Sequence, residues 1–237
     1  MAVFRLTDDL VFPPPELAEE DGLLAVGGDL GIERLLLAYT MGIFPWYSGT
    51  SPILWWSPDP RLVLFPEELK VSRSLRQTIK RGLYRVTFDT AFERVVVGCA
   101  EISRKHERGT WITEEMIDAY CRLHDAGFAH SVESWYGGEL AGGLYGVALG
   151  TVFFGESMFS GRSDASKVAF VKLVGQLATW NFTVVDCQVT TGHLTSLGAR
   201  EIPRSDFIKT LRGSLHKRTR RGPWSPIIKE ERADITG

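Results

Sequence analysis

Several features that would define a protein's class are missing from this sequence of 237 residues. No apolar run approaches the roughly 20 residues needed to span a bilayer. The first residues, MAVFRLTDDL, lack the basic start and apolar core of a signal peptide. We therefore expect a protein of the cytoplasm. The formal net charge of -2 argues against binding nucleic acid by bulk attraction, so a polyanion has to be held by a local patch.

Cysteine is scarce, and the usual catalytic and metal-binding patterns are absent. Cys99, Cys121 and Cys187 have neither metal nor redox spacing, and their apolar neighbours indicate reduced structural thiols. The sequence shows no Ser-His-Asp or Cys-His arrangement and no cluster with zinc spacing. It thus offers neither a strong nucleophile nor a metal site.

A carboxylate interrupts the apolar stretch TVFFGESMFS, residues 151–160. Its first residues predict a buried strand, whose regularity Gly155 breaks before Glu156 follows. An isolated carboxylate is expensive to bury, so Glu156 lies at the mouth of an apolar pocket or pairs with a cation. The alternative is a strand that ends at the surface with Glu156 in water.

A second apolar strand, TVVDCQV at 183–189, is also interrupted by polar residues. The two-residue period of a strand places Asp186 and Gln188 on one face, about 7 Å apart. A carboxylate and an amide that point the same way from an apolar strand indicate a site rather than a surface. This second interruption makes a functional role for Glu156 the better interpretation.

A short helix near residue 72 carries cations and no acid. Ser72 is a typical N-cap, and Gly82 ends the helix. The cations follow at spacings of three and four and continue beyond the helix: Arg73, Arg76, Lys80, Arg81 and Arg85. Such a stripe suits contact with phosphates, although a charge run is often only a solvated face. A second basic cluster, KRTRR at 217–221, is typical of a loose tail.

Residues 1–61 are rich in Pro, Gly and Trp and show little strand alternation. A short amphipathic helix is predicted over Ile32–Thr40. Five aromatic residues gather after it: Phe44, Trp46, Tyr47, Trp55 and Trp56. They form either the core of a small domain or a stacking surface for a ligand. We expect a small N-terminal domain over 1–61, followed by a larger domain over 62–237.

The order of elements after residue 62 predicts an α+β fold. A helix is expected over Ala91–Glu101, and three antiparallel strands over 130–154 are joined at the hairpin signals Gly137-Gly138 and Leu149-Gly150. A helix at about 165–180, the strand 183–189 and a last helix at 205–215 follow. The antiparallel sheet therefore turns parallel around the helix.

This order resembles the acetyltransferase fold of the GCN5-related type, a mixed sheet with flanking helices. The loop FSGRSDASK, however, lacks the glycine-rich nest that holds the pyrophosphate of coenzyme A. An acyl donor other than acyl-CoA is therefore expected.

Many short phrases are similar to those of the bacterial leucyl/phenylalanyl-tRNA-protein transferases. They are GGDL, GIFPWYS, ILWWSPDPR, GTWIT, GGLYGV, GESMFS, ASK, DCQV, SLGA and EIPR, spread from about Gly22 to Ile208. The resemblance implies an enzyme that uses neither metal nor coenzyme. It moves Leu, Phe or Met from aminoacyl-tRNA to the N-terminal Arg or Lys of acceptor proteins, which marks them for degradation by the N-degron pathway.

The resemblance also implies which residues carry the function. Peptide-bond formation falls on Glu156, Asp186 and Gln188, and tRNA binding on Arg76, Lys80 and Arg81. The donor side chain enters a hydrophobic pocket lined by Trp46, Trp111, Leu144, Phe153, Met158, Leu173, Leu177 and Val185. Several family members carry Met at the position of Leu144 and Phe at those of Leu173 and Leu177, so the balance among Leu, Phe and Met is left open.

The absence of a strong nucleophile fits this activity. An aminoacyl ester is already activated, so an enzyme needs chiefly to position a neutral amine about 3 Å from the carbonyl and to stabilise the developing charge. Two alternatives stay open: an acyl-CoA-dependent acyltransferase, and a noncatalytic adaptor that binds charged tRNA or protein N-termini.

Overall fold

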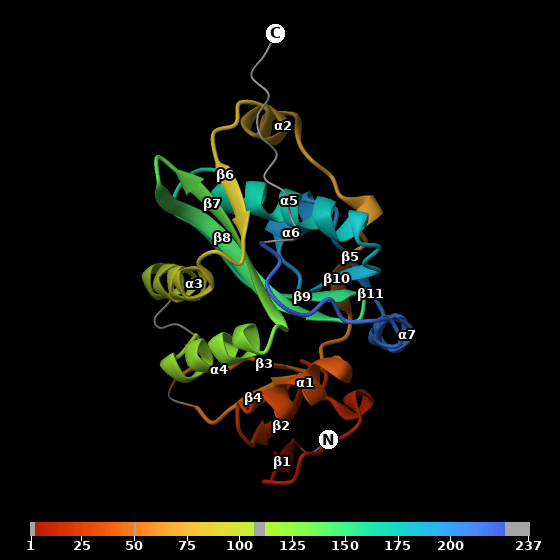
Figure 1. The fold of residues 1–237 in the computed structure, drawn as a ribbon. Helices are drawn as coiled ribbons and strands as arrows, with labels where there is room; N and C mark the ends of the chain where they lie inside the picture. Colours follow the sequence, from red (N-terminus) through yellow and green to blue (C-terminus); the bar gives the residue numbers. More distant parts are fainter. Residues whose placement is uncertain (1–2, 50, 107–111, 226–237) are drawn as a thin grey trace.

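The computed structural model describes residues 3–49, 51–106 and 112–225, which form two sheets with helices around them (Figure 1). The first sheet has the strand order β1-β2-β4-β3. Its strands are β1 (Phe4–Leu6), β2 (Leu23–Gly27), β3 (Phe44–Pro45) and β4 (Leu54–Trp56). The helix α1 (Ile32–Thr40) and the 3-10 turn η1 (Pro15–Leu17) belong to the same part of the chain.

The second sheet has seven strands in the order β11-β5-β10-β9-β8-β7-β6. They are β5 (Arg61–Leu64), β6 (Arg85–Phe88), β7 (Ala129–Tyr136), β8 (Glu139–Leu149), β9 (Val152–Ser160), β10 (Val184–Gln188) and β11 (Arg200–Ile202). The helices are α2 (Arg73–Lys80), α3 (Phe92–His106), α4 (Glu114–Asp125), α5 (Ala165–Thr179), α6 (Gly192–Ser196) and α7 (Arg204–Leu215), with a 3-10 turn η2 (Pro66–Glu68).

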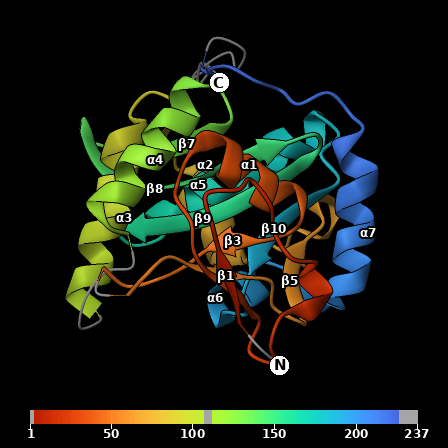
Figure 2. The same ribbon diagram turned by 90° about the horizontal axis from the view of Figure 1, so that it is seen from below.

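The seven-stranded sheet separates two apolar layers. One face packs against α3, α4 and the first sheet, whereas the other is covered by α5 (Figures 1 and 2). On β9 the two layers alternate at first, with Val152 and Phe154 on the side of the first sheet and Phe153 on the side of α5. The site residues described below therefore divide between two sides of one sheet.

The predicted α+β order is confirmed. Strands β7, β8 and β9 are antiparallel, and β10 pairs with β9 in parallel after α5. The helix predicted over Ile32–Thr40 has those bounds. Ser72 caps α2 by accepting a hydrogen bond from the Leu75 amide at 3.2 Å.

The N-terminal part shows little strand alternation in its sequence but forms a sheet, because short strands pair across the chain. Two predictions from the sequence are wrong. Helix α3 runs to His106, beyond the predicted end at Glu101. The segment 217–221 is no loose tail: Thr219 accepts a hydrogen bond from the Gly150 amide, and Arg221 donates one to the Ala126 carbonyl.

Gly155 breaks the regularity of its strand as predicted, because β9 contains a β-bulge next to it. Gly146 of β8 pairs with Gly155, and the adjacent Tyr145 pairs with Ser157, so Glu156 is the extra residue. The insertion shifts the alternation and brings Met158 to the layer of Phe153. The bulge therefore explains why β9 presents a carboxylate to one layer and Met158 to the other.

Strands β9 and β10 part where their site residues lie. They pair only from Val184 and Val152 to Asp186 and Phe154, after which β9 continues to Ser160 beside β8. Strand β10 has an irregularity of its own between Asp186 and Gln188, and Gln188 has a left-handed φ of 63°. The parallel pair thus opens at Glu156 and Gln188.

None of the helices that the structure describes is long and apolar enough to cross a membrane.

Candidate active site

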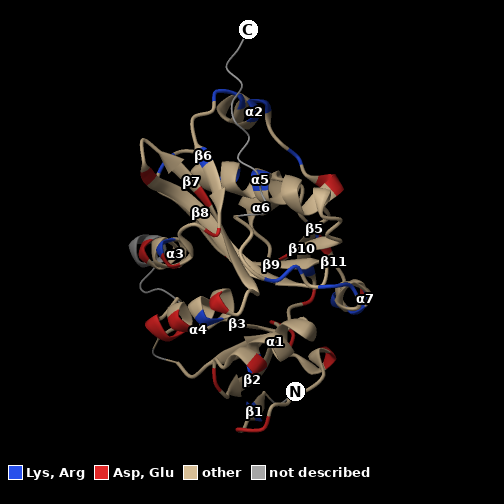
Figure 3. Ribbon diagram, viewed as in Figure 1, with Lys and Arg blue, Asp and Glu red and all other residues tan. Residues whose placement is uncertain are grey.

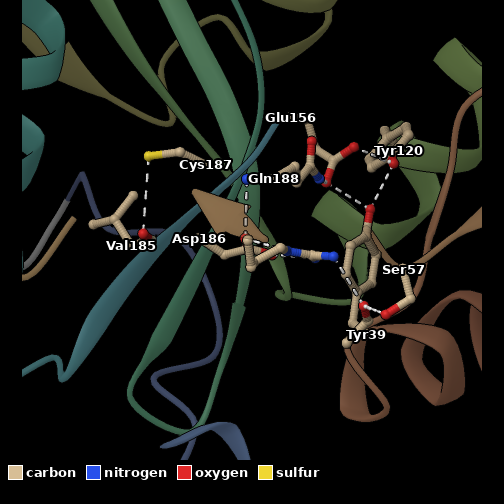
Figure 4. Close-up of polar contacts among 10 residues, drawn as sticks. Tyr39, Ser57, Tyr120, Glu156, Val185, Asp186, Cys187 and Gln188 are labelled. Carbon is tan, nitrogen blue, oxygen red and sulfur yellow. Dashed lines mark hydrogen bonds and ion pairs between the residues drawn. The ribbon is translucent and has the colours of Figure 1, made fainter. Parts of the chain in front are cut away.

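Glu156 is held by hydroxyl and amide groups from three different elements (Figure 4). Tyr39 of α1 donates to Oε1 at 2.8 Å, and Tyr120 of α4 donates to Oε2 at 2.6 Å. Gln188 of β10 donates to Oε1 through Nε2 at 3.1 Å. The carboxylate is buried and has no cation among its described partners, so the expectations of a water-exposed or cation-paired Glu156 are both wrong.

The surroundings of Glu156 raise its pKa to about 7. Burial is the largest cause, and the nearby Asp186 carboxylate acts in the same direction. The hydrogen bonds from Tyr120, Tyr39 and Gln188 favour the charged form and limit the increase. Glu156 can therefore bind or release a proton near neutral pH, as a group that takes part in proton transfer must.

Asp186 forms a buried ion pair with Arg61 of β5. The Arg61 guanidinium donates to both carboxylate oxygens, at 2.8 Å from Nε and 2.7 Å from Nη2. It lies between the rings of Phe44 and Phe207, at 4.8 and 4.7 Å from their centroids. Arg61 also donates to the Gly42 carbonyl at 3.1 Å. This ion pair joins the first sheet, β5, β10 and α7.

Asp186 and Gln188 are linked through the backbone of Gln188 rather than through contact between their side chains. The Gln188 amide donates to Asp186 Oδ1 at 3.0 Å, while the Gln188 side chain binds Glu156. Both side chains lie on the layer of the first sheet. The hydrogen bonds among the described residues leave the Gln188 side-chain carbonyl unused, so that oxygen is available to a ligand.

Most of the predicted pocket residues come together on the other layer of the sheet. Leu144, Phe153, Leu173, Leu177 and Val185 belong to one cluster, and each is at most 3% exposed. Met158 is partly buried against this cluster, at the edge where β9 leaves β10.

Two predicted pocket residues do not join that cluster. Trp46 is 42% exposed and packs against Trp56, with ring centroids 5.8 Å apart. Trp111 lies outside the described residues. A surface hollow of about 480 Å³ opens elsewhere, between α3 and strands β8 and β9, and none of the predicted site residues lines it.

The predicted tRNA-binding residues lie on or beside α2, at the end of the molecule away from the first sheet (Figure 3). Arg76, Lys80 and Arg81 are exposed. Their side chains therefore form an exposed cationic surface remote from Glu156.

Three residues of the site have no clear signal in the sequence. Arg61 is a single charge next to the expected domain boundary, and its burial depends on contacts 125 positions away. Tyr39 and Tyr120 belong to the apolar faces of their helices, which is where the rings lie. The sequence indicates such a residue only by a tyrosine on an apolar helix face, because a buried hydroxyl needs a hydrogen-bond partner.

The chain matches two family models. The model described as leucyl/phenylalanyl-tRNA protein transferase covers residues 63–212, and its N-terminal domain covers residues 28–59. The chain belongs to this family. Curated relatives named leucyl/phenylalanyl-tRNA--protein transferase include one from an Anaeromyxobacter species, 63% identical over 94% of this chain and 95% of its own length. The Syntrophobacter fumaroxidans relative is 63% identical over 89% and 90%, and the Desulforapulum autotrophicum relative 57% over 94% and 98%.

Likeness to solved structures is weak. A conserved protein of unknown function from Bacteroides thetaiotaomicron matches with a TM-score of 0.41 and 10% identity, over 67% of this chain and 56% of the other. Similarity at this level assigns neither fold nor function. Within the residues that the structure describes, no three His, Cys, Asp or Glu side chains are grouped to hold a metal ion.

We predict that the ion pair between Arg61 and Asp186 stabilises the fold. Replacing one partner leaves the other charge buried and unpaired, which costs about 3 to 5 kcal/mol. Arg61→Met and Asp186→Asn should each lower the unfolding free energy by that amount in urea titrations. The double variant should lose less than the sum, because the two residues share one interaction. Losses below about 1 kcal/mol for both single variants would contradict a stabilising role.

We predict a specific pH dependence of stability from Glu156. Its pKa is raised from 4.5 to about 7 in the folded protein, so folding retains a proton that the unfolded chain releases. Its contribution to stability is complete below about pH 4.5 and is lost as the pH rises through about 7. The unfolding free energy of Glu156→Gln, a variant of similar shape, should therefore decline less across this range than that of the wild type. Parallel pH profiles for the two proteins would refute the shift.

Proposed function

We propose that this chain transfers leucine, phenylalanine or methionine from aminoacyl-tRNA to the N-terminal Arg or Lys of acceptor proteins. The match to the transferase family over nearly the whole chain supports the aminoacyl transfer. The site adds the observation that carries the mechanism: a buried carboxylate of pKa about 7 hydrogen-bonded to Gln188. In this proposal the modified proteins are marked for degradation by the N-degron pathway in the cytoplasm, where charged tRNA is made.

The chemistry needs positioning and one proton transfer. The neutral α-amine of the acceptor attacks the ester carbonyl, a C–N bond forms, and the C–O bond to the tRNA ribose breaks. Gln188 accepts a hydrogen bond from the amine through its side-chain carbonyl, which its bond to Glu156 leaves unused. Ionised Glu156 takes the proton that the amine loses, and the ribose oxygen finally gains one proton.

Asp186 has a positioning role in this scheme. Its carboxylate is fully engaged by Arg61 and by the Gln188 amide. It therefore holds Gln188 in its left-handed conformation, from which the side chain reaches Glu156. Asp186 makes no contact with the Gln188 side-chain amide among the described residues, so it acts on Gln188 through the backbone.

The donor side chain occupies the apolar layer beside α5. Because Leu144, Phe153 and Leu173 are almost fully buried, we place the entrance for the donor side chain at Met158, where β9 leaves β10. The tRNA body lies against Arg76, Lys80 and Arg81 on the cationic surface of α2. We keep Trp111 as a proposed residue of this donor pocket, whereas Trp46 is left out because it lies outside the cluster that the other pocket residues form.

We further propose an acetyltransferase-like fold for the second sheet and two domains, 1–61 and 62–237. The parting of β9 from β10 and the crossover through α5 support the fold. The two family models, which end and begin at residues 59 and 63, support the boundary. Neither metal nor coenzyme has a step in this mechanism.

Transfer of labelled leucine from Leu-tRNA to a peptide that begins with Arg tests the function. We predict that Gln188→Ala lowers the turnover number by about 10²-fold, as expected when one positioning hydrogen bond is removed, while Leu-tRNA binding stays intact. The control is Gln176→Ala on α5, which should retain wild-type activity. Binding of Leu-tRNA without any transfer by the wild type would favour an adaptor, and transfer from acyl-CoA would favour an acyl-CoA enzyme.

We predict that Leu144→Phe impairs Phe transfer more than Leu transfer, because the added ring narrows the layer in which the donor side chain lies. The control is Leu144→Met, which nearly conserves volume. The ratio of kcat/KM for the two donors does not depend on the fraction of folded enzyme, since both are measured on one preparation. An unchanged ratio would remove Leu144 from the pocket. Efficient transfer of Ile or Val would argue against the pocket as a whole, because branching at Cβ should clash at its neck.

A further inference from the structure

The C-terminal part of the chain carries the densest run of positive charge that the transfer mechanism does not use. From Lys209 to Arg221 the sequence holds six Lys or Arg residues and no Asp or Glu, although the whole protein has a formal net charge of -2. Figure 3 shows this charge on α7 and on the segment that follows it. We name as the C-terminal cationic stripe the four residues Lys209, Arg212, Lys217 and Arg218, which are all exposed.

The segment after α7 is fixed to the protein by contacts of both its side chains and its backbone. The Thr219 hydroxyl binds the Gly150 amide at 2.9 Å, and the Gly222 amide donates to the Gly127 carbonyl at 3.1 Å. The Arg220 guanidinium lies 4.5 Å from the ring centroid of Trp180, and that of Arg221 lies 4.3 Å from Phe128.

Trp224 anchors the far end of this segment. Its side chain is fully buried, and its ring stacks on His130 with centroids 3.7 Å apart. Its backbone amide donates to Asp89 at 2.7 Å. Lys217 and Arg218 are therefore presented from a rigid support, unlike the cations of a loose tail, so binding a partner requires little further ordering of the backbone.

The spacing of the stripe suits a row of phosphates. Lys209 and Arg212 are three positions apart on the exposed side of α7, which brings neighbouring side chains to about 5 to 6 Å. Lys217 and Arg218 continue the charge past the end of the helix. Stabilisation of the helix dipole explains only cations in the last turn, so it accounts for Arg212 but not for Lys209 or Arg218.

We propose that the C-terminal cationic stripe is a second contact for the phosphate backbone of the donor tRNA, separate from α2. This inference rests on the proposed function. In Figure 1, α2 and α7 lie far apart on either side of the seven-stranded sheet, and Figure 2 also separates them. A tRNA is larger than this protein domain, so its backbone can reach both surfaces. In this proposal, α2 holds one part of the RNA, and the C-terminal cationic stripe restrains the orientation of the RNA.

Salt-dependent tRNA binding tests the stripe. The variants are Lys209→Gln/Arg212→Gln and Lys217→Gln/Arg218→Gln, measured by equilibrium binding of uncharged tRNA over a range of salt concentrations. Each pair should weaken binding by about tenfold at 0.1 M salt, and the slope of log K against log salt should fall by about 0.7 to 0.9 for each phosphate that is no longer neutralised. Arg5→Glu is the matched control, because it changes the net charge by the same -2 at an exposed residue of β1. Its binding should stay at the wild-type level.

A donor without the tRNA body separates binding from folding. With leucyl-adenosine and an Arg-peptide, both pairs should turn over like the wild type, because the stripe touches neither the ester nor the amine. Unchanged tRNA affinity and slope would overturn the proposal, as would a raised KM for a folded acceptor protein in place of weaker tRNA binding. A decrease in thermal stability with unchanged tRNA binding would mean that these cations stabilise the end of α7 and do not bind tRNA. Failure of the transferase function would show differently, as absence of transfer by the wild type from Leu-tRNA itself.

Discussion

The ion pair between Arg61 and Asp186 is the interaction on which the arrangement of the site depends. Two charges removed from water are tolerated because the guanidinium meets both carboxylate oxygens, a backbone carbonyl and two aromatic faces. The same pair ties the first sheet to the second through Gly42 and Phe44. Asp186 also accepts a hydrogen bond from the Gln188 amide. The ion pair therefore fixes the position of Gln188, whose side chain reaches Glu156.

The environment of Glu156 shows how the pKa of a buried carboxylate can lie near neutral pH without a cation as its partner. Burial disfavours the charge, and three neutral donors recover only part of that cost, which leaves a pKa of about 7. Two of these donors are tyrosines from α1 and α4, outside the strands that carry Glu156 and Gln188. The N-terminal part of the chain is thereby a structural component of the site.

The sheet divides the polar from the apolar half of the site. Glu156, Asp186 and Gln188 lie on the layer of the first sheet, whereas Phe153 and Val185 lie on that of α5. The two halves meet only where β9 leaves β10, since the remainder of that pairing is closed by backbone hydrogen bonds. In the proposed mechanism, the donor side chain enters one layer and its ester faces the other, so the donor lies at this opening, where the pairing of both strands is irregular.

The sequence by itself determined the α+β order, the cap at Ser72, the cationic face of α2 and the polar interruptions of two apolar strands at Glu156, Asp186 and Gln188. Each depends on residues close in the chain: hydrophobic period, a capping hydroxyl, charges three and four apart, or a polar residue in an apolar run. The resemblance to the transferase family rested on short phrases of the same local kind. Tertiary structure alone decided what those residues touch. Arg61 meets Asp186 across 125 positions, Tyr39 meets Glu156 across 117, and KRTRR becomes a fixed surface through contacts with Gly150, Trp180 and Ala126. The bulge at Glu156 belongs to the same class, because an extra residue is defined only relative to a paired strand, and pairing over such separations leaves no periodic trace in the sequence.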